Sequence, residues 1–524
     1  MQRSRGFVLV VVGLLVFSAT MVVSAATAPS RDVSAAGPSV PDTDLAPTDS
    51  ATASSPSDGS ATDTATNDAE STTATPTQSN RVLIGIQGGC AQWKCNGQVA
   101  LLSNTRGIEE REIQWRVSDA DSYFDVTRLA NGTVVAGFHH NDYEEDCGPY
   151  ESPCTKTGIR LIDPTGEGEP TTRTIFSMPV RTAFSSEIHD VEPLGDGQFL
   201  FTDMEYERVA IVEDGAIAWQ WNASQFYDAP DDPTRVDWLH INDVDVINES
   251  HYLVSVRNAN QVLVIERGAG VVEVINADRG GHDEACTEHA GIADHDGDGD
   301  VTCGNPEIID EQHNPQWLPN GAVLIADSEN DRVVELHRTE DGVWEPVWAL
   351  YEANGLPFNW PRDADRLPNG NTLITDSLQK RVLEVEPDGD VVWSHGTDLI
   401  PYEADPSPAG EYPGQNFGAV TATPERTVTD SQSDATTATQ SDATTATQSD
   451  ETTATPGALR TVDAAQAGGV EERDTTVPVL SLLLVGMKSV APWLPIWFTE
   501  AQIGATLLSV GLVAAGGIDS YRRD

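Results

Sequence analysis

Basic residues are scarce in this chain of 524 residues, which carries 30 lysines and arginines against 83 aspartates and glutamates, a formal net charge of -53 at pH 7. A field of that sign repels nucleic acid, so we exclude nucleic-acid binding as a function. The same charges repel one another within the fold unless concentrated salt screens them. The composition therefore predicts a protein of a salt-adapted, halophilic cell.

Cysteine is also rare, with six residues in the chain. The six form three close pairs: Cys90 and Cys95, Cys147 and Cys154, and Cys286 and Cys303. No pair has the Cys-x-x-Cys spacing and no paired histidine spacing accompanies them, so zinc is less favoured than local disulfide bonds. The pairs predict three disulfides and an oxidising compartment.

Long apolar runs are confined to the two ends of the chain. Residues 1–26 begin with two arginines, continue with an apolar run and end on small residues, which is typical of a signal peptide or a membrane anchor. Residues 502–519 form an apolar run followed by two arginines and predict a transmembrane helix with a cytoplasmic end. Residues 477–498 are apolar but broken by prolines, and predict an interfacial or membrane helix. We therefore expect the protein at the cell membrane, with its middle part extracytoplasmic.

Two segments contain little besides serine, threonine, alanine, aspartate and proline. They are residues 27–80 and residues 420–469, and the second includes the near-identical copies ATQSDATT and ATQSDETT. Such segments cannot bury enough apolar surface to offset the entropy of ordering the chain. We predict two disordered linkers that flank one folded unit at residues 81–413.

Helical periodicity is nearly absent from residues 81–413, and a repeated unit takes its place. Residues 313–336 read HNPQWLPNGAVLIADSENDRVVEL, and residues 361–393 begin PRDADRLPNGNTLITDS. Weaker copies begin near residues 124, 189 and 240. Each copy reads as a strand, an Asn-Gly-type turn, a second strand, a polar link and a third strand.

A polar residue recurs at the same position of each unit: Asp125, Asp190, Asp243, Asn314 and Asp363, spaced by 65, 53, 71 and 49 residues. Four-stranded blades with insertions fit these spacings. A β-sandwich does not explain why the same turn recurs with the same flanks. We therefore predict an all-β, six-bladed β-propeller in which residues 81–117 supply strands of the sixth blade and close the ring with the last one.

The first residues of each innermost propeller strand project at one mouth of the central channel. The polar candidates for a shared site at this mouth are His189, His240, Asn242, Arg257, His313, Asn314, Arg332 and Arg362. Neutral imidazole can act as nucleophile or base, and arginine stabilises the charge of a sulfuryl or phosphoryl group. The competing interpretation is that these side chains tie the inner strands together by hydrogen bonds. We favour a functional role for the histidines and a structural one for most of the repeated Asp and Asn positions.

The runs HDVEPLGDG, WLHINDVDV with SVRN, EQHNPQWLPNG with ADSENDR, and PRDADRLPNGNTLITDS resemble the arylsulfotransferase family, of halophilic archaeal type, over residues 80–400. The resemblance implies a six-bladed extracytoplasmic propeller that moves sulfate from a phenolic ester to a phenol acceptor through a sulfated histidine, without a nucleotide cofactor. It also implies that His240, His313 and Arg332 bind and stabilise the sulfate.

The resemblance places the nucleophilic histidine in the last such motif, where this chain has Arg362. Either His313 or His189 then substitutes, or the protein binds an anionic ligand or a surface partner without turnover. We predict a catalytic set of His189, His240, His313 and Arg332. We predict a substrate-binding set of Asn242, Arg257, Asn314 and Arg362.

A separate acidic motif follows the third unit. Asp294, Asp296, Asp298 and Asp300 have the alternating rhythm of a calcium loop, although its twelfth position is Asn305 rather than glutamate. In so acidic a chain the same residues also read as solvated surface. The sequence thus predicts either a structural calcium site or an exposed acidic loop, and no cofactor for catalysis.

Overall fold

The structure is a computed structural model that describes residues 81–90, 93–103, 112–164, 169–182, 185–287, 289, 291–407 and 500–521. Isolated positions are also described, at 11–12, 17–18, 20–21, 33–34, 484, 487–488 and 498. Apart from these positions, the predicted segments 1–26, 27–80, 420–469 and 477–498 lie outside the described residues.

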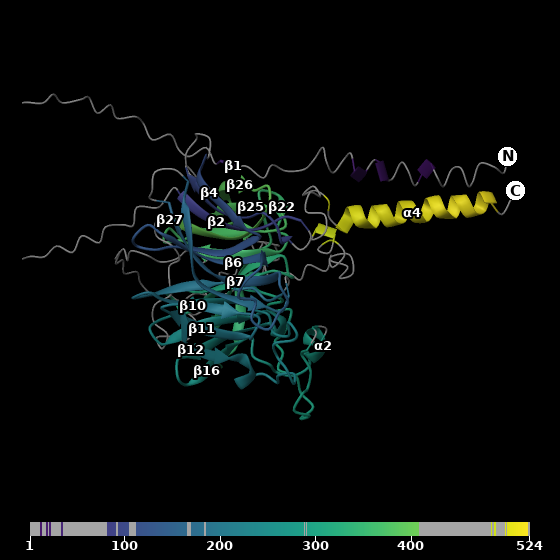
Figure 1. The fold of residues 1–524 in the computed structure, drawn as a ribbon. Coiled ribbons are helices and arrows are strands. Elements are labelled where there is room, and N and C mark those ends of the chain that lie inside the picture. The colour runs from purple at the N-terminus through teal and green to yellow at the C-terminus, as the bar shows by residue number, and fades with distance from the viewer. Residues whose placement is uncertain are drawn as a thin grey trace, which may run out of the picture.

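The described part of the chain contains six sheets of at least four antiparallel strands, in agreement with the predicted six-bladed propeller (Figure 1). The first blade is β5 (Ser122–Arg128), β6 (Val134–Tyr143), β7 (Cys154–Asp163) and β8 (Thr171–Val180). The second is β9 (Val191–Gly195), β10 (Gln198–Asp203), β11 (Arg208–Glu213) and β12 (Ala216–Asn222). The third is β13 (Ile241–Val246), β14 (His251–Val256), β15 (Gln261–Glu266) and β16 (Gly270–Ile275).

The later blades follow the same order. The fourth is β17 (His313–Trp317), β18 (Val323–Asp327), β19 (Arg332–Arg338) and β20 (Trp344–Leu350). The fifth is β23 (Pro361–Arg366), β24 (Thr372–Asp376), β25 (Arg381–Val385) and β26 (Val391–Gly396). The sixth is β27 (Ile400–Ser407), β2 (Arg81–Gly88), β3 (Gly97–Ser103) and β4 (Glu112–Ala120). Minor elements are β21 (Glu352–Ala353), β22 (Leu356–Pro357), the 3-10 turns η2 (Ala223–Gln225) and η3 (Arg257–Ala259), and helix α2 (Asp283–Cys286).

The sixth blade joins the two ends of the propeller sequence. Strand β27 comes from the carboxyl end and pairs antiparallel with β2 from the amino end, with Ala404 opposite Ile84. Figure 1 shows β2, β4 and β27 together although their colours lie far apart on the sequence bar. The prediction that residues 81–117 close the ring with the last strand is therefore confirmed.

The recurring Asn-Gly pairs form the same turn in three blades. In the fourth blade Leu318 and Ala322 are joined by a backbone hydrogen bond of 2.9 Å, and Gly321 between them has a φ of +81°. Gly132 and Gly370 lie at +89° and +87° in the equivalent turns. Glycine is favoured there because a side chain strains this left-handed backbone.

Six hydrogen bonds between neighbouring blades run around the whole ring. In each, a side-chain oxygen on or next to one inner strand accepts a backbone N–H of the next. The pairs are Asp125 with Val191 (3.1 Å), Asp190 with Val244, Asp245 with Trp317 (3.0 Å), Gln316 with Arg366 (2.8 Å), Asp363 with Ala404 (3.0 Å) and Glu403 with Val126 (3.4 Å). Three of the recurrent positions, Asp125, Asp190 and Asp363, therefore lock neighbouring blades. In the third and fourth blades the locking residues are Asp245 and Gln316, two residues beyond the recurrent position.

Apolar side chains fill the space between neighbouring sheets. One buried cluster combines Leu253 and Val264 of the third blade with Trp317 and Val334 of the fourth. The core is thus distributed around the ring, and the central channel is left to polar side chains.

The three predicted disulfides are present, between Cys90 and Cys95, Cys147 and Cys154, and Cys286 and Cys303. Strand β1 (Val33–Ser34), inside the predicted first linker, pairs with β26 and so departs from a linker without secondary structure. Helix α4 (Glu500–Tyr521), yellow in Figure 1, occupies the segment predicted as a transmembrane helix. Among the described residues, no helix has both the length and the apolar character needed to span a membrane.

Candidate active site

The starts of the inner strands meet at one end of the channel, which we call the mouth. Tyr402 of β27 lies at its centre, with the rings of His189 and His313 at 5.2 and 6.0 Å and the guanidinium carbon of Arg362 at 5.1 Å. The ring of His240 lies 5.5 Å from that of His189. The structure therefore brings together three predicted histidines and Arg362, which come from four different blades.

His313 has a defined tautomer. Its Nδ1 lies 3.1 Å from the carbonyl oxygen of Glu311 and 2.8 Å from Oγ of Ser328. A carbonyl can only accept, and the Ser328 hydroxyl donates to the Pro361 carbonyl at 2.7 Å, so Nδ1 of His313 carries the proton. Burial, and then the charge of Arg362, holds the pKa of His313 well below its usual value. The ring is therefore neutral at pH 7, with its lone pair on Nε2.

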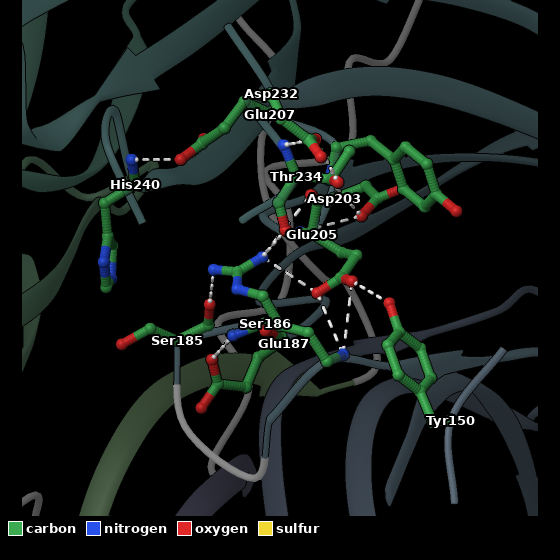
Figure 2. A network of polar contacts seen from close by, with 12 residues as sticks. Tyr150, Ser185, Ser186, Glu187, Asp203, Glu205, Glu207, Asp232, Thr234 and His240 are labelled. Carbon is green, nitrogen blue, oxygen red and sulfur yellow. Dashed lines mark hydrogen bonds and ion pairs between the residues drawn. The ribbon is translucent and has the colours of Figure 1, made fainter. Parts of the chain in front are cut away.

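His240 is oriented by two carboxyl groups. Its Nδ1 lies 2.8 Å from Oδ2 of Asp237. The backbone N–H groups of Leu239, His240 and Ile241 all donate to the side chain of Glu207, and Figure 2 shows the imidazole of His240 pointing away from Glu207. Burial lowers the pKa of His240, although Asp237 acts in the opposite direction. The arrangement presents a neutral, oriented imidazole whose Nε2 is not used by Asp237.

His189 packs against Phe124. Its ring centroid is 4.6 Å from that of Phe124, and its buried Nδ1 has no hydrogen-bond partner among the described residues. Burial, and then His240 and Lys94, holds the pKa of His189 well below its usual value. His189 is therefore a neutral, largely apolar wall of the site.

Arg362 is a buried guanidinium that forms no ion pair with a carboxylate in the described part of the chain. It donates to Oε1 of Gln87, and its Nε has no partner there. The rings of Trp93, Trp360 and Tyr402 lie 4.8, 4.3 and 5.1 Å from its guanidinium carbon. Burial lowers the pKa of Arg362 to about 9. Because no carboxylate balances this buried charge, an anionic ligand is its natural counterpart.

Arg257 reaches the same mouth but its charge is compensated. Its guanidinium pairs with the carboxylate of Glu311 and donates to Oδ1 of Asn258 at 2.8 Å. Its charge also lowers the pKa of both His240 and His313. The structure thus places Arg257 beside the candidate histidines, as predicted, with less capacity than Arg362 to hold an anion.

Arg332 does not join the mouth contacts. Its Nε pairs with Asp327 at 2.6 Å, and the rest of the guanidinium donates to the hydroxyl of Tyr351 and to the carbonyls of Glu307 and Ile308. The same clamp recurs elsewhere, with Arg208 on Asp203 and Arg381 on Asp376. The structure therefore gives Arg332 a structural role, in place of the predicted role in binding sulfate, because its donors are already occupied.

Replacing Arg332 with methionine is expected to lower the free energy of unfolding by about 3–5 kcal/mol, because it leaves Asp327 buried without its partner charge. Denaturant titration at fixed salt measures this loss. Arg381→Met, in the matched clamp of the fifth blade, serves as the control and should behave alike. If Arg332→Met abolished turnover while leaving stability intact, Arg332 would belong to the site after all.

The two predicted asparagines bridge blades. Nδ2 of Asn242 donates to the carbonyl of Gln312 at 2.9 Å, just before His313, and Nδ2 of Asn314 lies 3.4 Å from Glu403. Neither is among the ring contacts of the mouth. The structure thus shows Asn242 supporting the backbone beside His313, and Asn314 among the channel carboxylates.

Several residues of the mouth were not predicted from the sequence. Trp93 and Lys94 lie in the loop closed by Cys90 and Cys95, and Lys94 pairs with Glu187. Tyr402 belongs to the closing strand, which carries no repeat motif. The spacing of Cys90 and Cys95 was the one sequence signal for Trp93 and Lys94. It predicts a short closed loop after the first strand, and such a loop holds its residues near one end of the ring.

The predicted calcium loop is partly assembled. Asp294 and Asp296, together with Asp228, offer carboxylate oxygens that all lie within 4.8 Å of one another, whereas Asp298 and Asp300 are outside this group. Asp294 also accepts backbone N–H groups of the loop, at 2.6 Å from Gly297. Three oxygen ligands suit calcium, but these carboxylates are exposed and already stabilise the turn. The structure therefore leaves both interpretations of this loop in place, with Asp228 added to the candidate ligands.

Three similar solved structures share little sequence with the chain. A protein of unknown function from Bacteroides caccae is 14% identical, with 62% of this chain and 98% of that chain covered and a TM-score of 0.40. A putative 6-phosphogluconolactonase from Bacteroides uniformis is 12% identical, with 62% and 85% covered and a TM-score of 0.37. A virginiamycin B lyase from Staphylococcus aureus is 11% identical, with 51% and 75% covered and a TM-score of 0.28. Similarity at this level carries no functional conclusion. No curated protein matches the chain.

A family model gives a more specific match. The model described as Arylsulfotransferase (ASST) matches residues 109–341. The matched range contains His189, His240, Arg257 and His313, and ends before Arg362. The match and the six-bladed propeller together support the arylsulfotransferase family, and a function in sulfuryl transfer, for this chain.

Proposed function

We propose that the protein transfers a sulfuryl group from a phenolic sulfate ester to a phenol, through a sulfated His313 and without a nucleotide. The single observation that carries the proposal is the pairing of a neutral imidazole, whose Nδ1 proton is fixed by Glu311 and Ser328, with the uncompensated guanidinium of Arg362. A neutral imidazole is a competent nucleophile, and a buried cation stabilises the charge that develops on the transferred group.

In the first half-reaction, Nε2 of His313 attacks sulfur and the bond from sulfur to the phenolic oxygen breaks. Arg362 and the hydroxyl of Tyr402, which has no hydrogen-bond partner among the described residues, are the donors available to the sulfuryl oxygens. These donors are held in place before the reaction, so they stabilise the transition state without reorganisation.

Proton transfer falls to His240. Its Nδ1 is held by Asp237, so its Nε2 can accept the proton of the acceptor phenol as that oxygen attacks sulfur. The nitrogen-sulfur bond then breaks and neutral His313 is regenerated. In the first half-reaction the donor leaves as its phenolate, because neutral His240 has no proton to give, and the proton that His240 takes from the acceptor in the second half-reaction passes to water or to the released phenolate.

We further propose that the propeller works outside the cytoplasm, tethered to the membrane of a salt-adapted cell. The three disulfides support an oxidising compartment, and the charge of -53 supports a high-salt environment. Protease treatment of intact cells, followed by detection of the propeller, tests this placement.

Incubation with p-nitrophenyl sulfate and phenol in concentrated salt tests the activity. We expect nitrophenolate release that depends on phenol, with formation of phenyl sulfate and no requirement for nucleotide. Release must be measured on protein that shows a cooperative thermal transition. If such folded protein released no nitrophenolate, the proposal would be wrong, and a propeller that binds an anion without turnover would be favoured.

A further inference from the structure

The loop closed by Cys90 and Cys95 holds a lysine side chain inside the mouth. In addition to the disulfide, the loop has backbone hydrogen bonds of 2.8 Å from Gly89 to Cys95 and of 3.3 Å from Trp93 to Cys90. Lys94 follows Trp93, and 8% of its side chain is exposed. Burial of an ammonium is costly, so a lysine at this position is expected to contribute through its charge or its proton.

Two contacts in the described part of the chain define the place of the Lys94 ammonium. It pairs with the carboxylate of Glu187, and its Nζ lies 5.3 Å from the centre of the Phe124 ring. The same ring lies 4.6 Å from that of His189 and 5.3 Å from that of Tyr402. Since an ammonium has three N–H donors, one remains after these two contacts for a ligand in the mouth.

Lys94 and Arg362 take different places around the candidate nucleophile. Burial is the main cause of the lowered pKa of each mouth histidine, and the next cause for His313 is the charge of Arg362. The charge of Lys94 contributes instead to the lowered pKa of His189 and of His240. Transfer of a sulfuryl group, like that of a phosphoryl group, has the attacking and leaving atoms roughly in line, so the departing oxygen moves away from Nε2 of His313. The geometry thus favours Arg362 for the sulfuryl oxygens and Lys94 for the departing oxygen.

The first half-reaction, as described above, has no proton donor, because neutral His240 has no proton to give. A phenol without an electron-withdrawing group has a pKa close to that of tyrosine, about 10, so its anion is a poor leaving group. We propose that Lys94 is the general acid that protonates the departing phenolic oxygen, an inference that rests on the proposed sulfuryl transfer. As the bond from sulfur to oxygen breaks, its electron pair stays on the oxygen and one Nζ proton moves to that oxygen. Lys94 is left as a neutral amine, and water returns the proton before the next donor binds.

The surroundings of Lys94 suit this role. Burial, and then the charge of Arg362, lowers the pKa of Lys94 to about 7, although Asp237 and Asp121 act in the opposite direction. A general acid is most effective when its pKa lies near the operating pH. A lysine with its ordinary pKa of about 10.4 would hold its proton more tightly.

A series of donors with different leaving phenols tests the role of Lys94. The quantity measured is kcat/KM for p-nitrophenyl, p-cyanophenyl, p-chlorophenyl and unsubstituted phenyl sulfate, with p-cresol as acceptor in concentrated salt, because this ratio reports the first half-reaction. Lys94→Met should lower kcat/KM for phenyl sulfate by about a hundredfold or more, and that for p-nitrophenyl sulfate by about tenfold or less, since nitrophenolate leaves without a proton. The dependence of log kcat/KM on the pKa of the leaving phenol should therefore be steeper in the variant.

Lys94→Arg separates the proton from the charge. Arginine keeps a positive charge for Glu187 but does not give up its proton, so this variant should transfer from p-nitrophenyl sulfate much better than from phenyl sulfate. Lys156→Met is the matched control, because Lys156 is also buried, has its Nζ 4.8 Å from the centre of the Tyr143 ring, and takes part in none of the mouth contacts described above. The control should keep wild-type rates with every donor. Each variant must show a cooperative thermal transition.

Failure of this role and failure of the proposed function give different results. If the folded wild type transfers sulfate from none of the donors, the proposed function is wrong and the role of Lys94 is wrong with it. If the wild type is active but Lys94→Met slows every donor by the same factor, Lys94 has a structural role and the inference is overturned. Wild-type transfer from phenyl sulfate by Lys94→Arg, or a wild-type dependence on the leaving phenol as steep as that of Lys94→Met, would overturn it as well.

Discussion

Replacing His313 with asparagine is expected to reduce sulfuryl transfer by roughly a thousand-fold or more, because the residual rate then comes from binding and charge stabilisation alone. Asparagine keeps a polar group near Ser328 and Glu311 but has no imidazole Nε2. The measurement is acceptor-dependent nitrophenolate release at saturating donor. His337→Asn, on β19, the third strand of the same blade, is the matched control and should retain wild-type turnover.

Labelling separates loss of the nucleophile from general damage. With donor and no acceptor, the wild-type protein should gain the mass of one sulfuryl group on the peptide that contains His313, and the asparagine variant should gain none. His240→Asn should still accept the label, because His240 acts on the proton of the acceptor and p-nitrophenolate leaves without being protonated. A label that persists in the His313 variant would move the nucleophile to His189 or His240, the other two histidines of the mouth.

The position of Arg362 bears on whether the protein can catalyse sulfuryl transfer. The sequence resemblance placed Arg362 where a nucleophilic histidine was implied, which raised the alternative of a protein without turnover. The structure shows Arg362 close to His189 and His313, with three aromatic rings around it and no ion pair to a carboxylate among the described residues. Since the imidazole of His313 lies within the same set of contacts, an arginine at this position is compatible with catalysis by a histidine of the preceding blade.

The repeats predicted the propeller well because each blade carries its own evidence. A turn with recurring flanks fixes a hairpin locally in each unit, with an Asn-Gly pair in three of them, and five such units leave few alternatives for the whole ring. The convergence of His189, His240 and His313 followed from the same repetition, since the residues at the start of each inner strand face one mouth of the channel.

Arg332 shows where repetition misleads. Its motif repeats in Arg208 and Arg381, yet each guanidinium turns back onto an aspartate five residues earlier and never reaches the channel. The direction of the side chain decides whether the guanidinium reaches the channel, and the spacing of residues in the sequence does not reveal that direction.

Tyr402 and Lys94 could not be found because neither lies in a repeat. They reach the mouth only after strands from opposite ends of the propeller pair in the sixth blade, which is a long-range event without a local sequence signal. The locking role of Asp245 and Gln316 was missed for a related reason. They stand two residues beyond the recognised position, where the residue type varies from threonine to glutamate.

In the absence of divalent cations, the free energy of unfolding is expected to fall as pH rises from about 6.5 to about 8.5. Burial raises the pKa of Asp190 and of Asp363 to about 7, and that of Glu207 to about 8. The folded protein therefore binds more protons than the unfolded chain in this range, so deprotonation favours unfolding. Each unit of pKa shift corresponds to about 1.4 kcal/mol, so even one such carboxyl has a measurable effect.

Two other groups of residues act in the opposite direction. The buried histidines of the mouth have lowered pKa values, so they stabilise the fold as pH rises, but this gain is complete near the ordinary histidine value of 6.5. Lys94, whose pKa burial lowers to about 7, adds stability above that pH. Lys94 is a single group, whereas several buried carboxyls have raised pKa values. The free energy of unfolding is therefore still expected to fall as pH rises.

Calorimetric melting at fixed salt, in the presence of chelator, measures the slope. Asp405→Asn should flatten it and raise the melting temperature most at the alkaline end, because it removes a fully buried carboxyl whose pKa is raised by burial and then by Asp125. Glu335→Gln is the matched control, since His337 and Arg366 hold the pKa of Glu335 below its usual value despite its burial. That variant should lose stability without flattening the slope. A melting temperature that rises steadily with pH in the wild type would mean that the channel carboxyls are ionised throughout this range and that their charge is balanced by something other than protons.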